Sequence, residues 1–103
     1  MRPAPPETPA GVPGALVLRL VVRNHPGVMS HVCGLFARRA FNVDGILCLP
    51  VGDGTRSAVL LLVCDDGRVE QLMGQLRKLD DVLEIHRDAG GHAAFVAVAR
   101  YVV

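Results

Sequence analysis

Residues 23–30 read Arg-Asn-His-Pro-Gly-Val-Met-Ser. They lie between an apolar run at 15–22, which predicts a buried strand, and a helical pattern at 28–40. The stretch is therefore predicted to be a turn from a strand into a helix. The first N–H groups of a helix have no partner within it and, with the helix dipole, attract anions. Because Gly27 has no Cβ, a ligand could approach the backbone there. The turn indicates a pocket for a small carboxylate such as an amino acid, although a glycine that serves only the turn would give the same pattern.

The composition fits one small domain. Of the 103 residues, 50% are hydrophobic and 20% are charged, and the net charge is +1. The near-neutral balance gives no sign of a nucleic-acid or membrane-surface binder. No apolar run reaches the length of about 18 residues that a membrane span needs. The apolar share is high for so short a chain, which suggests that a partner covers some apolar surface.

The cysteines and the start of the chain both bear on localisation. Cys33, Cys48 and Cys64 lie among apolar residues and lack a C-x-x-C spacing. This favours reduced thiols in the core of a cytoplasmic protein over disulfides. The first residues carry many prolines and no apolar stretch of the kind found in secretion signals. We therefore expect a cytoplasmic protein.

The order of the predicted elements indicates the fold class. Residues 1–14 are expected to form a flexible Pro-rich tail. Residues 15–88 carry the order strand, helix, strand, strand, helix, strand, with strands at 15–23, 42–51, 56–64 and 82–87. Right-handed crossovers fold this order into a ferredoxin-like βαββαβ sandwich, an α+β fold with two helices on one face of an antiparallel sheet. In the C-terminal extension, 89–103, a flexible joint at 89–91 is expected to precede an extra strand at 93–103.

Details of the pattern predict how these elements pack. The strand at 56–64 is apolar on both faces, so it should be central and covered on both sides. Gly45 suggests a bulge and Pro50 an edge position for the strand at 42–51. Asp65 and Asp66 are expected to cap the second helix. The buried stripes are assigned to Met29, Val32, Cys33, Phe36 and Ala40 in the first helix and to Val69, Leu72, Met73, Leu76 and Leu79 in the second.

Several chemistries find no support in the residues. The four histidines lack metal-ligand spacing and are treated as lone surface side chains. No glycine-rich phosphate loop or nucleophilic serine motif is present. RNA-binding domains of this order stack bases on central-strand aromatics, and the strands at 15–23 and 56–64 have none. A small ferredoxin-like phosphatase would use an arginine such as Arg23 at the turn, but the neutral turn suits a monoanion better.

Three stretches resemble a known family. They are RNHPGVM at 23–29, HVCGLFARRAFNV at 31–43 and GILCLP at 45–50. These closely resemble the regulatory small subunit of acetohydroxyacid synthase (acetolactate synthase), in its short form with a single ACT domain. The resemblance runs from about residue 16 to about residue 87. It implies the ACT fold, which has the βαββαβ order, and residues 93–103 resemble only the opening strand of the second domain found in longer relatives.

The resemblance also implies a function. It implies a non-catalytic chain that activates the catalytic subunit and confers feedback inhibition by valine in branched-chain amino acid biosynthesis. The catalytic subunit, a transferase, would hold thiamine diphosphate, FAD and magnesium, and this chain would hold no cofactor. The implied partners are a second copy of the chain, the catalytic subunit and valine. Alternatives are an amino-acid-sensing ACT module that regulates another enzyme, or the small phosphatase.

The resemblance places valine at the interface of the homodimer. Backbone N–H groups at the start of the first helix would meet its carboxylate through charge-assisted hydrogen bonds. Amide carbonyls of the asparagines would accept from its ammonium, one of them reaching across from the partner protomer. One methylene distinguishes valine from leucine by only about 1–3 kcal/mol, so overlapping specificity is expected. The apolar face of 56–64 and the C-terminal strand are candidates for contact with the catalytic subunit. The implied ligand residues are Asn24, Gly27, Val28, Met29, Asn42 and Val43.

Overall fold

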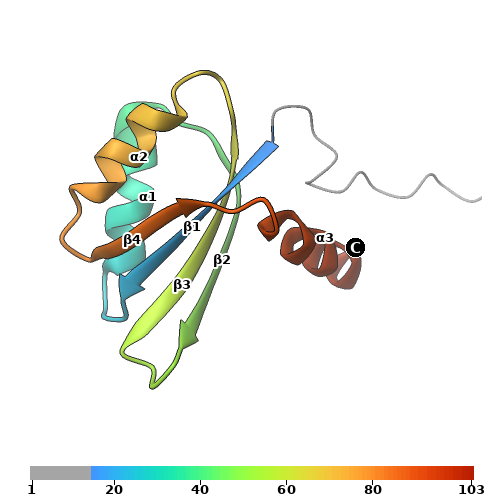
Figure 1. The fold of residues 1–103 in the computed structure, drawn as a ribbon, viewed down its shortest axis with the longest axis horizontal. Coiled ribbons are helices and arrows are strands. Elements are labelled where there is room, and N and C mark those ends of the chain that lie inside the picture. Colours follow the sequence, from blue (N-terminus) through green and yellow to red (C-terminus); the bar gives the residue numbers. More distant parts are fainter. Residues whose placement is uncertain (1–14) are drawn as a thin grey trace, which may run out of the picture.

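The computed structural model describes residues 15–103. These residues form a four-stranded sheet with helices on both of its faces (Figure 1). The expected tail at 1–14 lies outside the described residues. All paired strands are antiparallel, in the order β2-β3-β1-β4. This confirms the predicted ferredoxin-like βαββαβ fold. The elements are β1 (Ala15–Arg23), α1 (Val28–Arg39), β2 (Val43–Val51), β3 (Arg56–Cys64), α2 (Val69–Arg77), β4 (Val82–Arg87) and α3 (Gly91–Val102).

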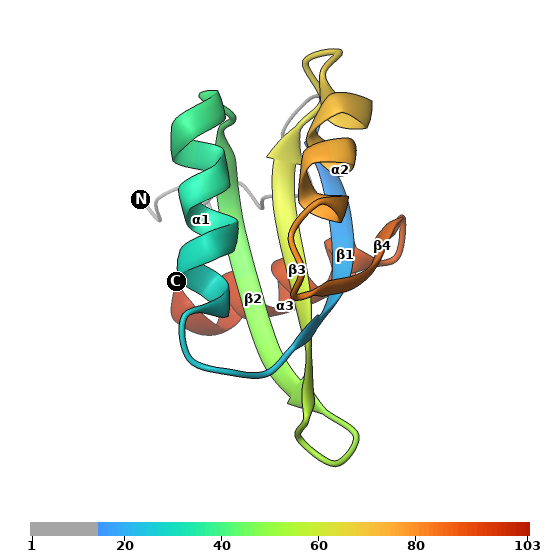
Figure 2. The same cartoon turned by 90° about the vertical axis from the view of Figure 1, so that its left-hand side faces the viewer.

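The main core lies between the sheet and the pair α1 and α2, which stand side by side on one face (Figure 2). β3 is central, as its two apolar faces predicted, and β2 is an edge strand, as Pro50 suggested. The register of β2 against β3 shifts between Val43 and Gly45, so the predicted bulge is confirmed. Alternate residues of β1 and β3 face this core, including Leu18, Leu20, Val59 and Leu61.

The two helices differ in how well their buried faces were predicted. In α2 the assignment is confirmed for four buried residues, with Leu79 partly buried beyond the helix end. In α1 the buried residues are Val28, Val32, Leu35 and Phe36. Cys33 and Ala40 are exposed, so their assignment to the core was wrong. The large side chains of Leu35 and Phe36 set the rotation of the helix, and Cys33 therefore faces outward.

Two other local expectations are corrected. Cys33, Cys48 and Cys64 are all exposed thiols in this chain rather than core residues. The N-cap of α2 is Arg68, without a side-chain cap. Asp65 and Asp66 instead accept hydrogen bonds from the backbone N–H groups two residues on, at 3.3 and 3.1 Å, and so shape the turn before the helix.

The C-terminal segment is a helix, which corrects the predicted extra strand. α3 lies on the opposite face of the sheet from α1 and α2 (Figure 1). It contains four alanines, the strongest helix formers, whose spacing among valines only imitates alternation. Phe95 is buried against Val17 and Leu62, and this tertiary contact favours the helix. Gly91 is buried where α3 begins, so it is part of a packed junction.

Two glycines allow α3 to approach the sheet. A Cβ added at Gly91 would lie 2.4 Å from Cγ1 of Val17, and one added at Gly45 would lie 2.8 Å from the Phe95 ring. Gly91→Ala is therefore expected to lower the free energy of unfolding by about 1–3 kcal/mol, the usual cost of overpacking. The matched control is Gly74→Ala in α2, where a Cβ meets nothing within 4 Å. It should raise that free energy by about 0.5–1 kcal/mol. Urea unfolding measures both, and equal effects of the two variants would contradict the close packing of α3.

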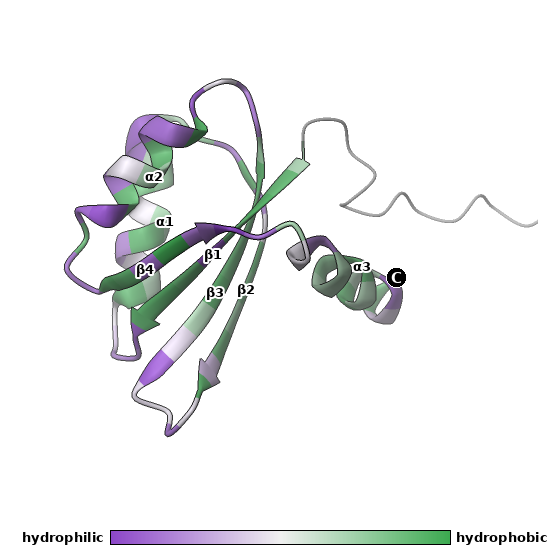
Figure 3. Cartoon of the chain, viewed as in Figure 1, coloured by the Kyte–Doolittle hydropathy of each residue, from purple (hydrophilic) through white to green (hydrophobic). Residues whose placement is uncertain are grey.

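The second face of the sheet is only partly covered. Leu62 is 2% exposed beneath α3, which confirms cover at that end of β3. Beyond it a groove of about 500 Å³ remains between α3 and the β2–β3 pair. Figure 3 shows the hydrophobic character of these strands and of α3. The residues that line the groove include Leu47, Leu49, Ala58, Leu60 and Val98.

Candidate functional site

The turn between β1 and α1 has the geometry of an anion-binding helix end. Gly27, the N-cap of α1, has φ 88° in the left-handed region, and a Cβ there would meet nothing within 4 Å. Glycine is thus needed for the backbone conformation, and the space before it is open. The first helical bond runs from the N–H of His31 to the Gly27 carbonyl at 3.1 Å. The N–H of Met29 comes before this first helical bond, so it has no partner within the helix. The N–H of Val28 makes only a long hydrogen bond of 3.3 Å to the His25 carbonyl.

Asn24 fixes the turn to the β2–β3 hairpin. Its backbone N–H donates to the Thr55 carbonyl at 3.0 Å, and its side-chain Nδ2 donates to the Gly54 carbonyl at 2.8 Å. The side-chain NH₂ is therefore engaged within the protomer. The remaining polar atom of the amide, Oδ1, is an acceptor of the kind that an ammonium group needs.

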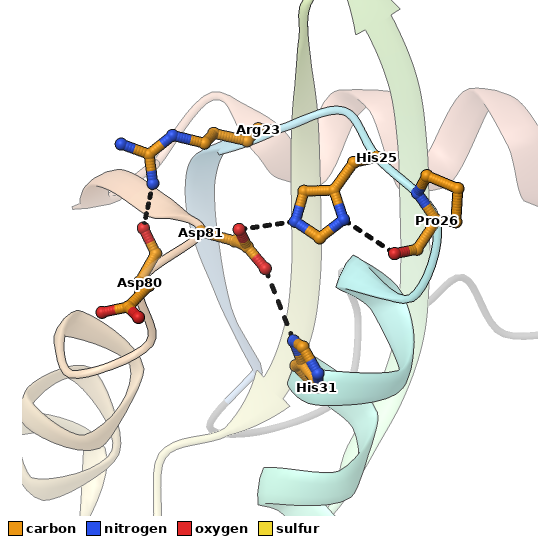
Figure 4. A network of polar contacts seen from close by, with 6 residues as sticks. All are labelled: Arg23, His25, Pro26, His31, Asp80 and Asp81. Carbon is orange, nitrogen blue, oxygen red and sulfur yellow. Dashed lines mark hydrogen bonds and ion pairs between the residues drawn. The ribbon is translucent and has the colours of Figure 1, made fainter.

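An aspartate from the loop just before β4 holds the other side of the turn (Figure 4). Oδ1 of Asp81 lies 2.6 Å from Nε2 of His25, and its Oδ2 lies 3.4 Å from Nδ1 of His31. Nδ1 of His25 lies 2.7 Å from the carbonyl oxygen of Pro26. The hydrogen bond to Asp81 raises the pKa of His25, and the same bond lowers the pKa of Asp81.

Sequence reasoning missed this network. The two histidines were interpreted as lone surface side chains, and Asp81 is 56 residues away from His25 in the chain. No local pattern connects positions so far apart. The antiparallel pairing of β1 with β4 is what brings the loop after β1 next to the loop before β4.

The structure separates the predicted ligand residues into two groups. Asn24, Gly27, Val28 and Met29 lie together at the N-terminal end of α1. Asn42 and Val43 follow the C-terminal end of that helix (Figure 2). The 12 residues of α1 span about 18 Å at 1.5 Å per residue, so one protomer does not bring the groups together. Asn42 donates from Nδ2 to the neighbouring Asp44 carboxylate at 2.9 Å, which leaves its carbonyl as the acceptor.

Residues 15–103 contain neither a candidate metal centre nor a candidate membrane-spanning helix. No group of three or more His, Cys, Asp and Glu side chains in this range is placed to hold a metal ion. Likewise, no helix in the described part of the chain is both long and apolar enough to cross a membrane.

Comparisons with known proteins agree with this architecture. The family model described as an AHAS small subunit-like ACT domain matches residues 18–84. The acetolactate synthase isozyme 1 small subunit of Escherichia coli K12 is 56% identical over 84 residues, which cover 82% of this chain and 88% of the relative. The isozyme 3 small subunit of the same strain is 36% identical over 70 residues, covering 67% of this chain and 43% of that longer relative.

A solved structure gives the same result. The crystal structure of the acetolactate synthase small subunit from Thermotoga maritima has a TM-score of 0.66 and 33% sequence identity, covering 74% of this chain and 48% of that one. The fold and the glycine turn at its first helix thus define an ACT domain. The chain belongs to the acetolactate synthase small-subunit family, as a regulatory ACT-domain subunit.

Proposed function

We propose that this chain binds valine at the turn formed by residues 24–29, activates the catalytic subunit of acetolactate synthase and makes it sensitive to valine. The observation that carries the proposal is the open, left-handed Gly27 at the N-terminus of α1. The N–H groups at the start of α1 precede the first helical bond, and such groups favour a carboxylate over a neutral or cationic group. The ligand's ammonium would be met by the Oδ1 atoms of Asn24 and Asn42.

The separation of the two asparagines favours a site shared by two copies of the chain. β2 is an edge strand whose outer side has no paired strand within residues 15–103, and α1 lies beside it on one face of the sheet. A two-fold axis at this edge sets the α1 helices of the two copies antiparallel. The turn of one protomer then lies beside Asn42 of its partner. Valine would be held between them, so that binding and dimerisation strengthen each other.

The catalytic subunit is proposed to contact the groove beside α3. A dimer formed along the β2 edge leaves this second face of the sheet uncovered. Its apolar side chains are unusually exposed, with Leu49 at 67% and Val98 at 40%. Tyr101 on α3 is a further exposed hydrophobic side chain, at 91%. Exposed apolar surface of this kind is typical of an interaction site.

Reconstitution tests the proposal. The catalytic subunit is assayed for acetolactate formation from pyruvate, with thiamine diphosphate, FAD and magnesium, alone, with this chain, and with this chain and valine. The chain should raise the rate, and valine should remove the increase. Leu49→Asp, which places a charge in the groove, should lose activation while calorimetry still detects valine binding. No activation by the wild-type chain would contradict the proposal, and valine binding without activation would indicate a sensor for another enzyme.

A further inference from the structure

We propose that Asp81 positions the amino-acid-binding turn through His25, and that the affinity for valine therefore falls as the pH rises and His25 loses its proton. The inference rests on the proposed binding of valine at residues 24–29. It adds to that site a residue from the loop before β4, which does not touch the ligand itself. Asp81 is thus a positioning residue, and its effect is transmitted through the His25 ring.

The first step is the protonation state of His25. Its two ring nitrogens each lie beside an acceptor, the Asp81 carboxylate at 2.6 Å and the Pro26 carbonyl at 2.7 Å. A neutral imidazole has one N–H and can donate to only one of them, whereas the imidazolium donates to both. Two acceptors at these distances therefore favour the protonated ring. A deprotonated ring would leave two lone pairs facing each other at one of the two contacts, and that contact would open.

The second step connects the ring to the ligand. The peptide bond between Pro26 and Gly27 is trans and planar, so its carbonyl and its N–H point in opposite directions. When His25 holds the Pro26 carbonyl, the Gly27 N–H is directed away from the ring. No residue within 15–103 accepts a hydrogen bond from that N–H. It is therefore available to the carboxylate of valine, and losing the His25 contact frees this peptide to rotate.

The third step is the rigidity of the support. The Asp81 side chain is only 14% exposed, and its backbone carbonyl accepts from the Arg23 N–H at 2.9 Å. The Arg23 guanidinium donates to the carbonyl of Asp80. The end of β1 and the loop before β4 thus form one fixed unit (Figure 4). A mobile carboxylate could follow the ring, whereas a fixed one can position it.

The direction of the pH effect follows from the groups around the ring. The contact with Asp81 raises the pKa of His25 above its ordinary 6.5, with a smaller opposing effect from the charge of Arg23 on β1. Asp81 has its pKa lowered, first by His25 and less by His31 of α1. The contact is therefore complete while Asp81 is ionised and His25 is protonated, and it is lost as the pH rises through the raised pKa of His25. The β2–β3 hairpin that Asn24 contacts carries the charged residues Asp53, which Thr55 holds by two hydrogen bonds, and Arg56.

The experiment uses the full chain and two measurements. An NMR titration of the His25 ring in the absence of ligand reports its pKa, and calorimetry reports the Kd for valine at pH 6 and pH 8.5. In the wild-type chain, binding should weaken by about fivefold at the higher pH, as expected for one lost hydrogen bond. Asp81→Asn keeps the shape of the side chain without its charge. It should lower the pKa of His25, weaken binding at pH 6 and flatten the pH profile.

Glu84→Gln is the matched control, because the hydrogen bond and ion pair of the Glu84 side chain go to His86 on β4, at 3.4 Å, and not to residues 24–29. This control should leave the pH profile of valine binding unchanged. The amino group of valine titrates in the same way with every variant, so it does not account for a difference between their pH profiles. If Asp81→Asn binds valine with the wild-type affinity and pH profile, this inference is overturned while the proposed function stands. If the wild-type chain binds no valine at either pH, both are overturned, whatever the NMR titration shows for His25.

Discussion

Gly27→Asp is expected to leave the reconstituted enzyme active but insensitive to valine. The substituted carboxylate would occupy the open space before Gly27 and would repel the ligand's carboxylate. It would also compete for the unpaired N–H groups at the start of α1. Hydrogen bonds to a charged group contribute about 1.5–3 kcal/mol each. Losing one of them and adding repulsion should weaken valine binding by about 100-fold or more.

The variant also places an L-residue at φ 88°, which costs about 1–2 kcal/mol of backbone strain. A control must share that strain and the added charge. Gly67→Asp does so, because Gly67 has φ 90° and open surroundings in the connection from β3 to α2. The measurement is acetolactate formation over a range of valine concentrations. Gly67→Asp should keep the wild-type response, and a Gly27→Asp holoenzyme that remains as sensitive as wild type would show that the ligand site lies elsewhere.

The sequence predicted the βαββαβ order because local periodicity is strong in those segments. Leu18, Leu20 and Val22 alternate on β1, and β3 is apolar on both faces, so their burial depends little on context. The glycine turn could also be predicted from the sequence, because Gly27 lies between a predicted strand and the start of a predicted helix. In both cases the signal lies within one stretch of about ten residues.

The features that sequence analysis missed depend on contacts between distant segments. α3 is helical because Phe95 packs between α3 and the sheet, against Val17 and Leu62. Without that contact, its alanines and valines alternate well enough to imitate a strand. The bond between Asp81 and His25 requires β1 and β4 to pair first. Local composition carries no record of either contact.

Mixed dimers of two inactive variants should recover valine binding at half of the wild-type stoichiometry. The variants are Gly27→Asp, which blocks the turn, and Asn42→Ala, which removes the acceptor proposed to reach across from the partner. As a homodimer, each should lose most of its valine response. Asn42→Ala should weaken binding by about 10–100-fold, the equivalent of one hydrogen bond to a charged group.

The recovery follows from how a two-fold dimer distributes its parts. In a mixed dimer, one site combines the altered turn of the first chain with the altered Asn42 position of the second and carries both defects. The other site combines a normal turn with a normal Asn42 and carries none. One intact site per dimer is therefore expected, which calorimetry on differently tagged, co-purified chains would detect as half of the normal valine uptake.

A site contained within one protomer gives a different result, because every chain in the mixed dimer then carries a defect and nothing is recovered. The roughly 18 Å length of α1 between the turn and Asn42 is the reason to expect recovery. Mixing Gly27→Asp with Asp81→Asn provides the matched comparison. Asp81 supports the turn of its own chain, so the mixed dimer has no fully normal site and should bind no better than the Asp81→Asn homodimer.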